Sequence, residues 1–191
     1  LAFFTFQSFE ENIDLAKLEK SGVAFNRPLT DLVRHVAEHQ LLLQRYLGGE
    51  KAVESEIVIR QAAVDAAFDA QAQQQRKLGT DLHFTNGDLE TAGLAEVAPE
   101  KIRAQWQTLK TGWRQLTLEH SEDQHELLIS AILAAIDHVN DNSKLALDPA
   151  LDSFHLLAAS FEVMPAVQFH LSQVDEQGLQ ALAEPGAART A

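Results

Sequence analysis

Cysteine is missing from this sequence of 191 residues. The protein therefore has no disulfide, no zinc–thiolate site and no cysteine nucleophile. A protein without thiols suits an oxidising compartment, where a stray thiol is a liability, although cytosolic proteins can also lack cysteine. The absence favours a location outside the cytoplasm.

Helix-breaking residues are also scarce, with 5 prolines and 9 glycines. Alanine, leucine, glutamine and glutamate dominate the sequence, and all four form helices readily. No useful stretch alternates between apolar and polar residues as a strand would. The composition predicts an all-α protein.

Positive charge is under-represented. Lysine and arginine number 15 against 28 acidic residues, which gives a net charge of −13. Such a chain is repelled by nucleic-acid phosphates and by anionic lipid headgroups. We therefore expect no nucleic-acid partner, and the simplest role of the charge is to keep the domain soluble.

Long apolar runs are missing as well. The longest, Leu127 to Ile136, is shorter than the roughly 18 residues that span a bilayer, so it predicts a core helix. The apolar residues Leu1 to Phe4 lack the charged region of a signal peptide. We expect them to be the outer end of a membrane helix, in a fragment of a longer protein.

Apolar residues recur at spacings of three, four and seven along several segments, which is the period of one helix face. The first predicted helix covers residues 9–47, with a kink or break near Asn26 because Pro28 follows. The second covers residues 52–78 and is capped by Gly79. Residues 80–98 read as a loop with a turn at Asn86-Gly87.

The third helical segment begins at Pro99 and continues to Asn140. Ser121 and Gln124 fit a capping box, which predicts a restart or bend there. A fourth segment begins at Asp148-Pro149. These segments predict an elongated antiparallel four-helix bundle with kinked long helices, formed by residues 1–180 and followed by a tail or linker at 181–191.

A resemblance to a known family is carried by residues 125–157, HELLISAILAAIDHVNDNSKLALDPALDSFHLL. The stretch Leu147-Asp148-Pro149, followed by Leu151, Asp152, Ser153 and Phe154, resembles a motif in periplasmic sensor regions of methyl-accepting chemotaxis proteins. Related transmembrane histidine kinases and cyclic-di-GMP enzymes carry it too. Weaker similarities, at Gly22, Pro28 and Trp106 among others, extend over most of the chain.

The resemblance implies a periplasmic sensor domain of a membrane-anchored bacterial receptor, binding a small ligand and forming a homodimer. Two departures bear on the ligand. The family's His-Arg-Gly is replaced here by His39-Gln40-Leu41, and its tyrosine pair by Phe154-His155. A ligand shared with the family is therefore not implied.

The motif also has a purely structural interpretation. Asp148 and Pro149 suit a helix start, and Asp152 lies in the first turn, where its charge opposes the positive end of the helix. Ser153 follows directly. These four residues are predicted to form a structural motif.

Eight histidines raise the question of a metal site. His35 and His39 share one helix face, and Glu122-His125 and Asp152-His155 have ligand-like spacing. Bundle metal sites need more donors than these pairs supply. We expect no metal and no cofactor. No nucleophile elbow or phosphate loop is present, so we expect no enzyme activity.

The candidates for ligand binding are cationic and aromatic. A guanidinium matches a planar anion such as a carboxylate or nitrate, and tryptophans can wall a pocket between helices. The residues chosen on these grounds are Arg34, Arg45, Trp106, Trp113 and Arg114. The competing interpretation is that the arginines pair with surface acids and the tryptophans lie in the core.

The sequence thus predicts a periplasmic sensor or signal-input domain that binds a small molecule and relays a conformational change. Two alternatives remain open: a helical protein-interaction module without a small ligand, and a metal- or haem-binding bundle.

Overall fold

The computed structural model describes residues 2–145 and residue 174. The described part is helical and contains no strand, which confirms the all-α prediction for these residues. The long helices are α1 (Ala2–Leu47), α2 (Glu54–Leu78), α4 (Pro99–Gly112) and α5 (Leu118–Ser143). The short α3 (Asn86–Thr91) and the 3-10 turns Lys51–Val53, Ala95–Val97 and Trp113–Gln115 lie between them.

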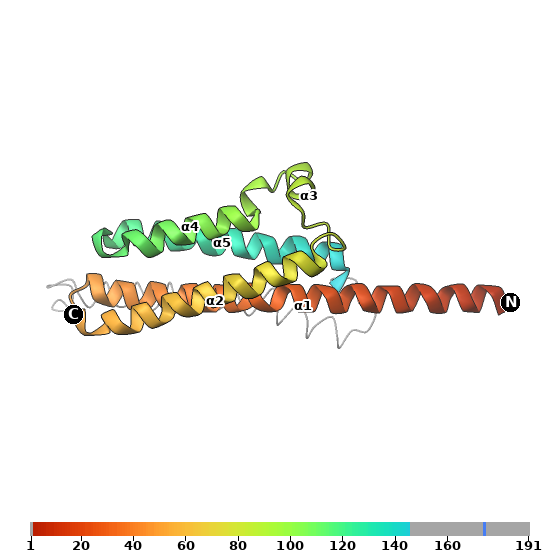
Figure 1. Ribbon diagram of the computed structural model, residues 1–191, viewed down its shortest axis with the longest axis horizontal. Helices are drawn as coiled ribbons and strands as arrows, with labels where there is room; N and C mark the ends of the chain where they lie inside the picture. The colour runs from red at the N-terminus through yellow and green to blue at the C-terminus, as the bar shows by residue number, and fades with distance from the viewer. Residues whose placement is uncertain (1, 146–173, 175–191) are drawn as a thin grey trace, which may run out of the picture.

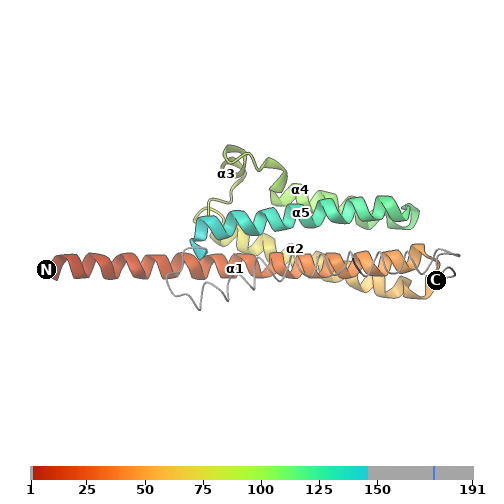
Figure 2. The same cartoon turned by 180° about the vertical axis from the view of Figure 1, so that it is seen from behind.

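Helix α1 is the longest element, with 46 residues or about 70 Å of helix at 1.5 Å per residue. It packs against α2 and α5, and α4 packs against α5 and α2. Figures 1 and 2 show these helices side by side, with the N-terminal end of α1 extending beyond the other labelled helices. The α1–α2 and α4–α5 connections lie at the same end.

The predicted break in α1 is wrong, because the helix continues through Pro28. Proline removes the N–H that would bond the carbonyl of Ala24. The turns on both sides are nevertheless held by core packing, since Phe25, Leu29 and Leu32 are almost fully buried. Tertiary packing here outweighs the local preference.

Two other local predictions are corrected. Asn86 and Gly87 do not form a turn within a loop, because they are the first residues of α3. Thr85 and Asp88 form a reciprocal capping box at the start of this helix. Ser121 does not cap a helix either. Helix α5 already begins at Leu118, capped by Thr117, and Ser121 is buried inside it. The predicted end of α2 at Leu78 and the start of α4 at Pro99 are confirmed, whereas α2 begins at Glu54, two residues after the predicted start.

The core has two parts. The larger one is built from the facing stripes of α1, α2, α4 and α5, including Val36, Val64, Ile102 and Ile132. The smaller one lies near the two connections and contains Leu43, Val53, Ile57 and Trp113. Within the described part of the chain, no helix is both long and apolar enough to cross a bilayer.

Candidate functional site: a cavity with an unpaired amide

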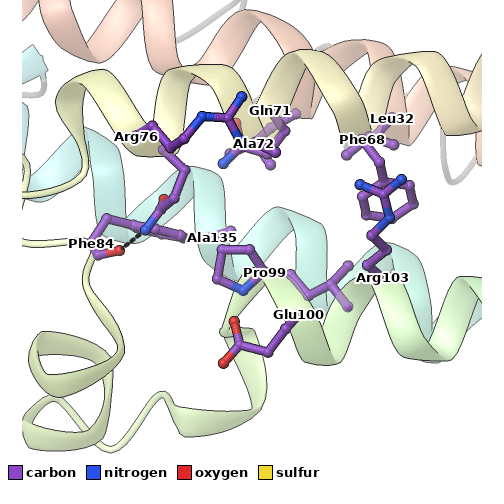
Figure 3. Close-up of a pocket in the computed structure, with 13 residues that line it drawn as sticks. Leu32, Phe68, Gln71, Ala72, Arg76, Phe84, Pro99, Glu100, Arg103 and Ala135 are labelled. Carbon is purple, nitrogen blue, oxygen red and sulfur yellow. Dashed lines mark hydrogen bonds between the residues drawn. The ribbon is translucent and has the colours of Figure 1, made fainter.

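A cavity of about 300 Å³ lies between α2 and α4, with α1 and α5 behind it. Figure 3 shows residues of α2 above the cavity and residues of α4 below it. The volume is at the lower end of the range for small-molecule sites. Its walls are mainly apolar, and the principal side chains are Leu29, Leu32, Phe68, Phe84, Ile102 and Ala135.

The walls follow from the helix periodicity. Leu29 and Leu32 lie one turn apart on the buried face of α1, and Phe68 and Ala72 are likewise i, i+4 neighbours on α2. The side chain of Ala72 is short, so it leaves part of the space between α2 and α4 unfilled.

Gln71 is the unusual residue in the cavity. Only 3% of it is exposed, yet neither its Oε1 nor its Nε2 has a hydrogen-bond partner among the described residues. An unpaired buried amide costs about 1–3 kcal/mol. One helical turn on, the Nε2 of Gln75 donates to the carbonyl of Phe84 over 2.5 Å, while its Oε1 is unpaired. One donor and two acceptors of these two amides are therefore buried without a partner among the described residues.

Charged groups frame the opening. Arg103 lies over the ring of Phe68 and donates to the carboxylate of Asp69 over 2.7 Å. Glu100 accepts a hydrogen bond from Asn86 over 2.6 Å. Arg76 is exposed and forms no ion pair with any of the described residues. In Figure 3 Arg76 is labelled on α2 at the end of the cavity opposite Arg103. The opening thus has one guanidinium available for an anion.

A second polar cluster lies deeper, between α1 and α5. His39 and His125 are both fully buried, and their ring nitrogens are 2.9 Å apart, from Nδ1 of His39 to Nε2 of His125. The Nδ1 of His125 lies 2.6 Å from the carbonyl of Ser121, which can only accept, so this nitrogen carries the proton. His39 therefore donates to His125, and Gln61 donates to the Nε2 of His39 over 3.2 Å.

This chain of hydrogen bonds satisfies two neutral imidazoles. Burial lowers the pKa of His125 to about 4, against a weaker opposing effect of its bond to Ser121. Burial lowers the pKa of His39 as well, and the positive charge of Arg60, like that of a protonated His125, adds to the shift. Both rings are therefore uncharged at neutral pH.

Helix α4 connects the histidine cluster to the cavity, because Trp106 contacts His39 and Ile102 and Arg103 line the cavity. Trp106 meets His39 edge to face, with ring centroids 5.1 Å apart, and lies one turn beyond Ile102 and Arg103. Its Nε1 donates to Asp65 over 2.8 Å. Lys110 donates to the other oxygen of the same carboxylate over 2.5 Å. These contacts fix the position of α4 relative to α1 and α2.

The predicted ligand arginines are separated by the structure. Arg34 pairs with Asp31 and Glu38, Arg45 with Glu50, and Arg114 with Glu54. Each pair is partly or largely exposed, and the three arginines have different acidic partners. None of the three lines the cavity.

The predicted tryptophans lie in the core. Trp106 is fully buried, and Trp113 is 2% exposed and contacts Tyr46 edge to face. Neither lines the cavity. The five residues thus remain candidates by sequence alone, whereas the structure assembles Gln71, Gln75 and Arg76. Sequence reasoning missed these because an amide in an alanine- and glutamine-rich helix has no distinguishing pattern.

The histidine pairs weighed as metal ligands also separate. His35 contacts Arg60 over 2.7 Å and Glu38 over 3.2 Å, whereas His39 turns to His125. In residues 2–145, histidines and carboxylates form no group of three that could hold a metal ion. The motif residues Asp148, Pro149, Asp152 and Ser153, and the pair Asp152-His155, lie outside the described residues.

No protein-family model matches the chain, and no curated protein or solved structure is significantly similar to it.

Proposed function

We propose that this chain is the signal-input domain of a bacterial transmembrane receptor, located outside the cytoplasm, and that it binds a small molecule between its helices. The observation that carries the proposal is the cavity, in which Gln71 is buried without a partner. A ligand with complementary polar atoms removes that penalty on binding. The sequence motif at Leu147 to Phe154 supports the receptor context.

The packing supports a relay. In this proposal α1, α2, α4 and α5 act as an antiparallel four-helix bundle. Residues from all four helices line the cavity. Packed helices shift between discrete arrangements, and a ligand shifts their populations only by contacting the two arrangements differently. Helix α1 is the natural carrier because it both forms a wall of the cavity and extends furthest from it.

A thermal-shift screen of the whole chain against organic acids, amino acids, amides and inorganic anions tests binding. Ala72→Leu places a larger side chain in the cavity, and Ala70→Leu makes the same change at an exposed position of α2 that does not line the cavity. We expect a ligand to raise the melting temperature of the native chain and of Ala70→Leu, but not of Ala72→Leu. A screen without any such ligand contradicts the proposed function.

The relay is tested by distance measurement. Because the chain has no cysteine, pairs of cysteines can be introduced and spin-labelled cleanly. Labels at the exposed positions Lys20 on α1 and Asp141 on α5 report movement between these helices. A ligand-dependent change in the distance distribution supports the relay, and an unchanged distribution at saturating ligand contradicts it.

One observation favours a second role. Val58 and Ile59 are adjacent on α2 and are 50% and 69% exposed. Exposed apolar neighbours are typical of a contact surface. A protein-interaction module would use this face rather than the cavity, so Ile59→Lys would abolish its binding while leaving the ligand-dependent thermal shift intact.

A further inference from the structure

Two buried polar pairs join the described residues of α1 and α5, and they lie well apart along the interface. The Nδ2 of Asn26 donates to the Oδ1 of Asn140 over 2.8 Å, and both residues are buried. The second pair is His39 and His125. Asn26 and His39 are 13 residues apart on α1, which corresponds to about 20 Å of helix. One of the two pairs can therefore take up a proton and the other cannot.

The end of the interface at Asn26 is held closely. Gly22, one turn earlier on α1, lets the helices approach so near that a Cβ atom would overlap the side chain of Ser143. Pro28 follows Asn26 by two residues and leaves the carbonyl of Ala24 without its helical N–H. Helices bend most readily where such a backbone bond is missing. Helix α1 thus has a close contact with α5 and, next to it, a point where it bends easily.

The end at the histidines does not accommodate a charge while it is closed. Both rings are fully buried, and neighbours one turn away on the two helices, including Val36, Leu43 and Leu128, are fully buried and apolar. Placing an unpaired charge among apolar groups costs far more than burying a neutral polar group. Opening the helices at this end admits water, which hydrates an imidazolium. A proton on His39 or His125 is therefore better accommodated in an open arrangement.

The groups that the other helices bring to the pair do not offset this cost. Helix α2 contributes the neutral amide of Gln61 and the positive charge of Arg60. Helix α4 contributes Trp106, whose Nε1 is bonded to Asp65, and Lys110 donates to the other oxygen of that carboxylate. The one carboxylate among these groups is therefore already paired, and Arg60 repels an imidazolium.

We propose that α1 and α5 form a hinge operated by protons. At acidic pH the pair of His39 and His125 takes up a proton, and the two helices open at this end so that water hydrates the charge. The pair of Asn26 and Asn140 stays closed, and α1 bends near Pro28. Acidity is then an input to the domain that depends neither on the cavity nor on its ligand.

The linkage between protonation and opening sets the size of the effect. A hydrated histidine has a pKa near 6.5, whereas burial holds the pKa of His125 in the closed arrangement at about 4. The open arrangement therefore binds the proton first as the pH falls. For one proton, the ratio of open to closed molecules should rise about twentyfold between pH 7 and pH 5.

Thiol labelling measures even a rare opening, because the chain has no cysteine of its own. Val36→Cys places a thiol three residues from His39, and the matched Val139→Cys places one beside Asn140; both valines are fully buried. Each labelling rate is divided by that of the same thiol in the urea-unfolded chain at the same pH, which removes the titration of the thiol itself. The remaining ratio reports the fraction of molecules that are open at that site.

We expect the open fraction at Val36→Cys to rise about twentyfold between pH 7 and pH 5. It should depend only weakly on low concentrations of urea, because a hinge exposes little surface. Labelling of Val139→Cys should be slower and should depend steeply on urea, as it does for global unfolding. In a chain that also carries His39→Leu and His125→Leu, the rise at Val36→Cys should disappear.

Three results would overturn the proposal. Equal open fractions with the same steep urea dependence at both thiols would show that the sites open only by global unfolding. An open fraction at Val36→Cys that does not change with pH would show that no proton operates the hinge. A rise that persists without the two histidines would assign the effect to another group, such as the neighbouring His35. The first two results are obtained with both histidines in place, so they hold even if the double variant folds poorly.

Discussion

His39 donates its Nδ1–H to the Nε2 of His125 across 2.9 Å, joining α1 to α5 inside the protein. The carbonyl of Ser121, four residues earlier on α5, can only accept, so the Nδ1 of His125 carries the proton. The Nε2 of His125 is therefore the acceptor for His39. Protonation of His125 would place two N–H groups face to face. The pair is therefore stable only while both rings are neutral.

Acid should weaken the fold through this pair. An unfolded histidine titrates near pH 6.5, whereas burial holds the pKa of folded His125 at about 4, so the unfolded state binds more protons between these values. The stabilisation that depends on a neutral His125 is fully present above about pH 6.5 and is lost as the pH falls toward 4. We expect the native chain to be more stable than His125→Leu at pH 7, and this difference in the free energy of unfolding to shrink by about 1–2 kcal/mol at pH 5.

Chemical denaturation at several pH values measures this change. His83→Asn is the matched control, because His83 is exposed and asparagine tolerates its positive φ of 50°. The control should parallel the native chain over the whole range. A constant difference between the native chain and His125→Leu would contradict the neutral pair.

Single and double replacement of the pair should be non-additive. His125→Leu leaves the Nδ1–H of His39 buried without an acceptor, and we expect it to cost about 2–4 kcal/mol. In the double variant with His39→Leu no such donor is left, so the second change should cost less than it does alone. A double-mutant cycle from denaturation curves measures the coupling. A coupling near zero would show that the histidines act independently.

Gly22 on α1 lies against the end of α5. A Cβ atom there would overlap the side chain of Ser143 and come within 2.9 Å of Leu145. We expect Gly22→Ala to push the helices apart and to destabilise the protein by about 1–3 kcal/mol. Gly112→Ala is the control, since a Cβ at Gly112 meets no atom within 4 Å. Thermal melts compare the two, and equal melting temperatures would refute the close approach.

Asp65 links α2 to two residues of α4. Burial alone would raise the pKa of its carboxyl, but hydrogen bonds from Lys110 and Trp106 outweigh this effect and lower it. We expect Asp65→Asn to cost about 1 kcal/mol at pH 7, because Lys110 loses its partner in a partly exposed pair. The loss should shrink as the pH falls below the ordinary aspartate pKa of 3.8 and vanish only below the lowered pKa of Asp65, where the native carboxyl is also protonated.

Tryptophan fluorescence supplies a second measurement for this prediction, since the Nε1 of Trp106 is bonded to Asp65. The exposed pair of Asp69 and Arg103 is the control, and Asp69→Asn should change neither the stability nor the emission appreciably. An Asp65→Asn variant with native emission and stability would contradict the link.

Local sequence signals predicted much of the fold. Pro99 marks the first residue of α4, and the limits of α2 follow from its composition and from Gly79. The same kind of signal failed at Pro28, Asn86 and Ser121. In each case a longer-range contact or a nearer cap prevailed: core packing around Pro28, the capping box of Thr85 and Asp88, and Thr117 ahead of Ser121. Proline inside a helix costs about 3 kcal/mol, which packing offsets at Pro28, whereas at Asn86 and Ser121 one local cap prevailed over another.

The candidate site was less predictable. Cationic and aromatic residues were the reasonable choice for anion binding, but Arg34, Arg45 and Arg114 each have an acidic partner. The residues around the cavity are ordinary by type. Gln71 differs from the exposed Gln73 only in which face of α2 it occupies and in what lies opposite.

The sequence by itself determined that the described chain is helical, acidic and free of disulfides, because helix propensity, charge and thiol content are properties of residues taken one at a time or at short spacing. The tertiary structure alone decided that His39 meets His125, that Gln71 has no partner, and that a cavity lies in front of Ala72. Those facts depend on residues far apart in the chain. Only the packing of α1, α2, α4 and α5 brings them together.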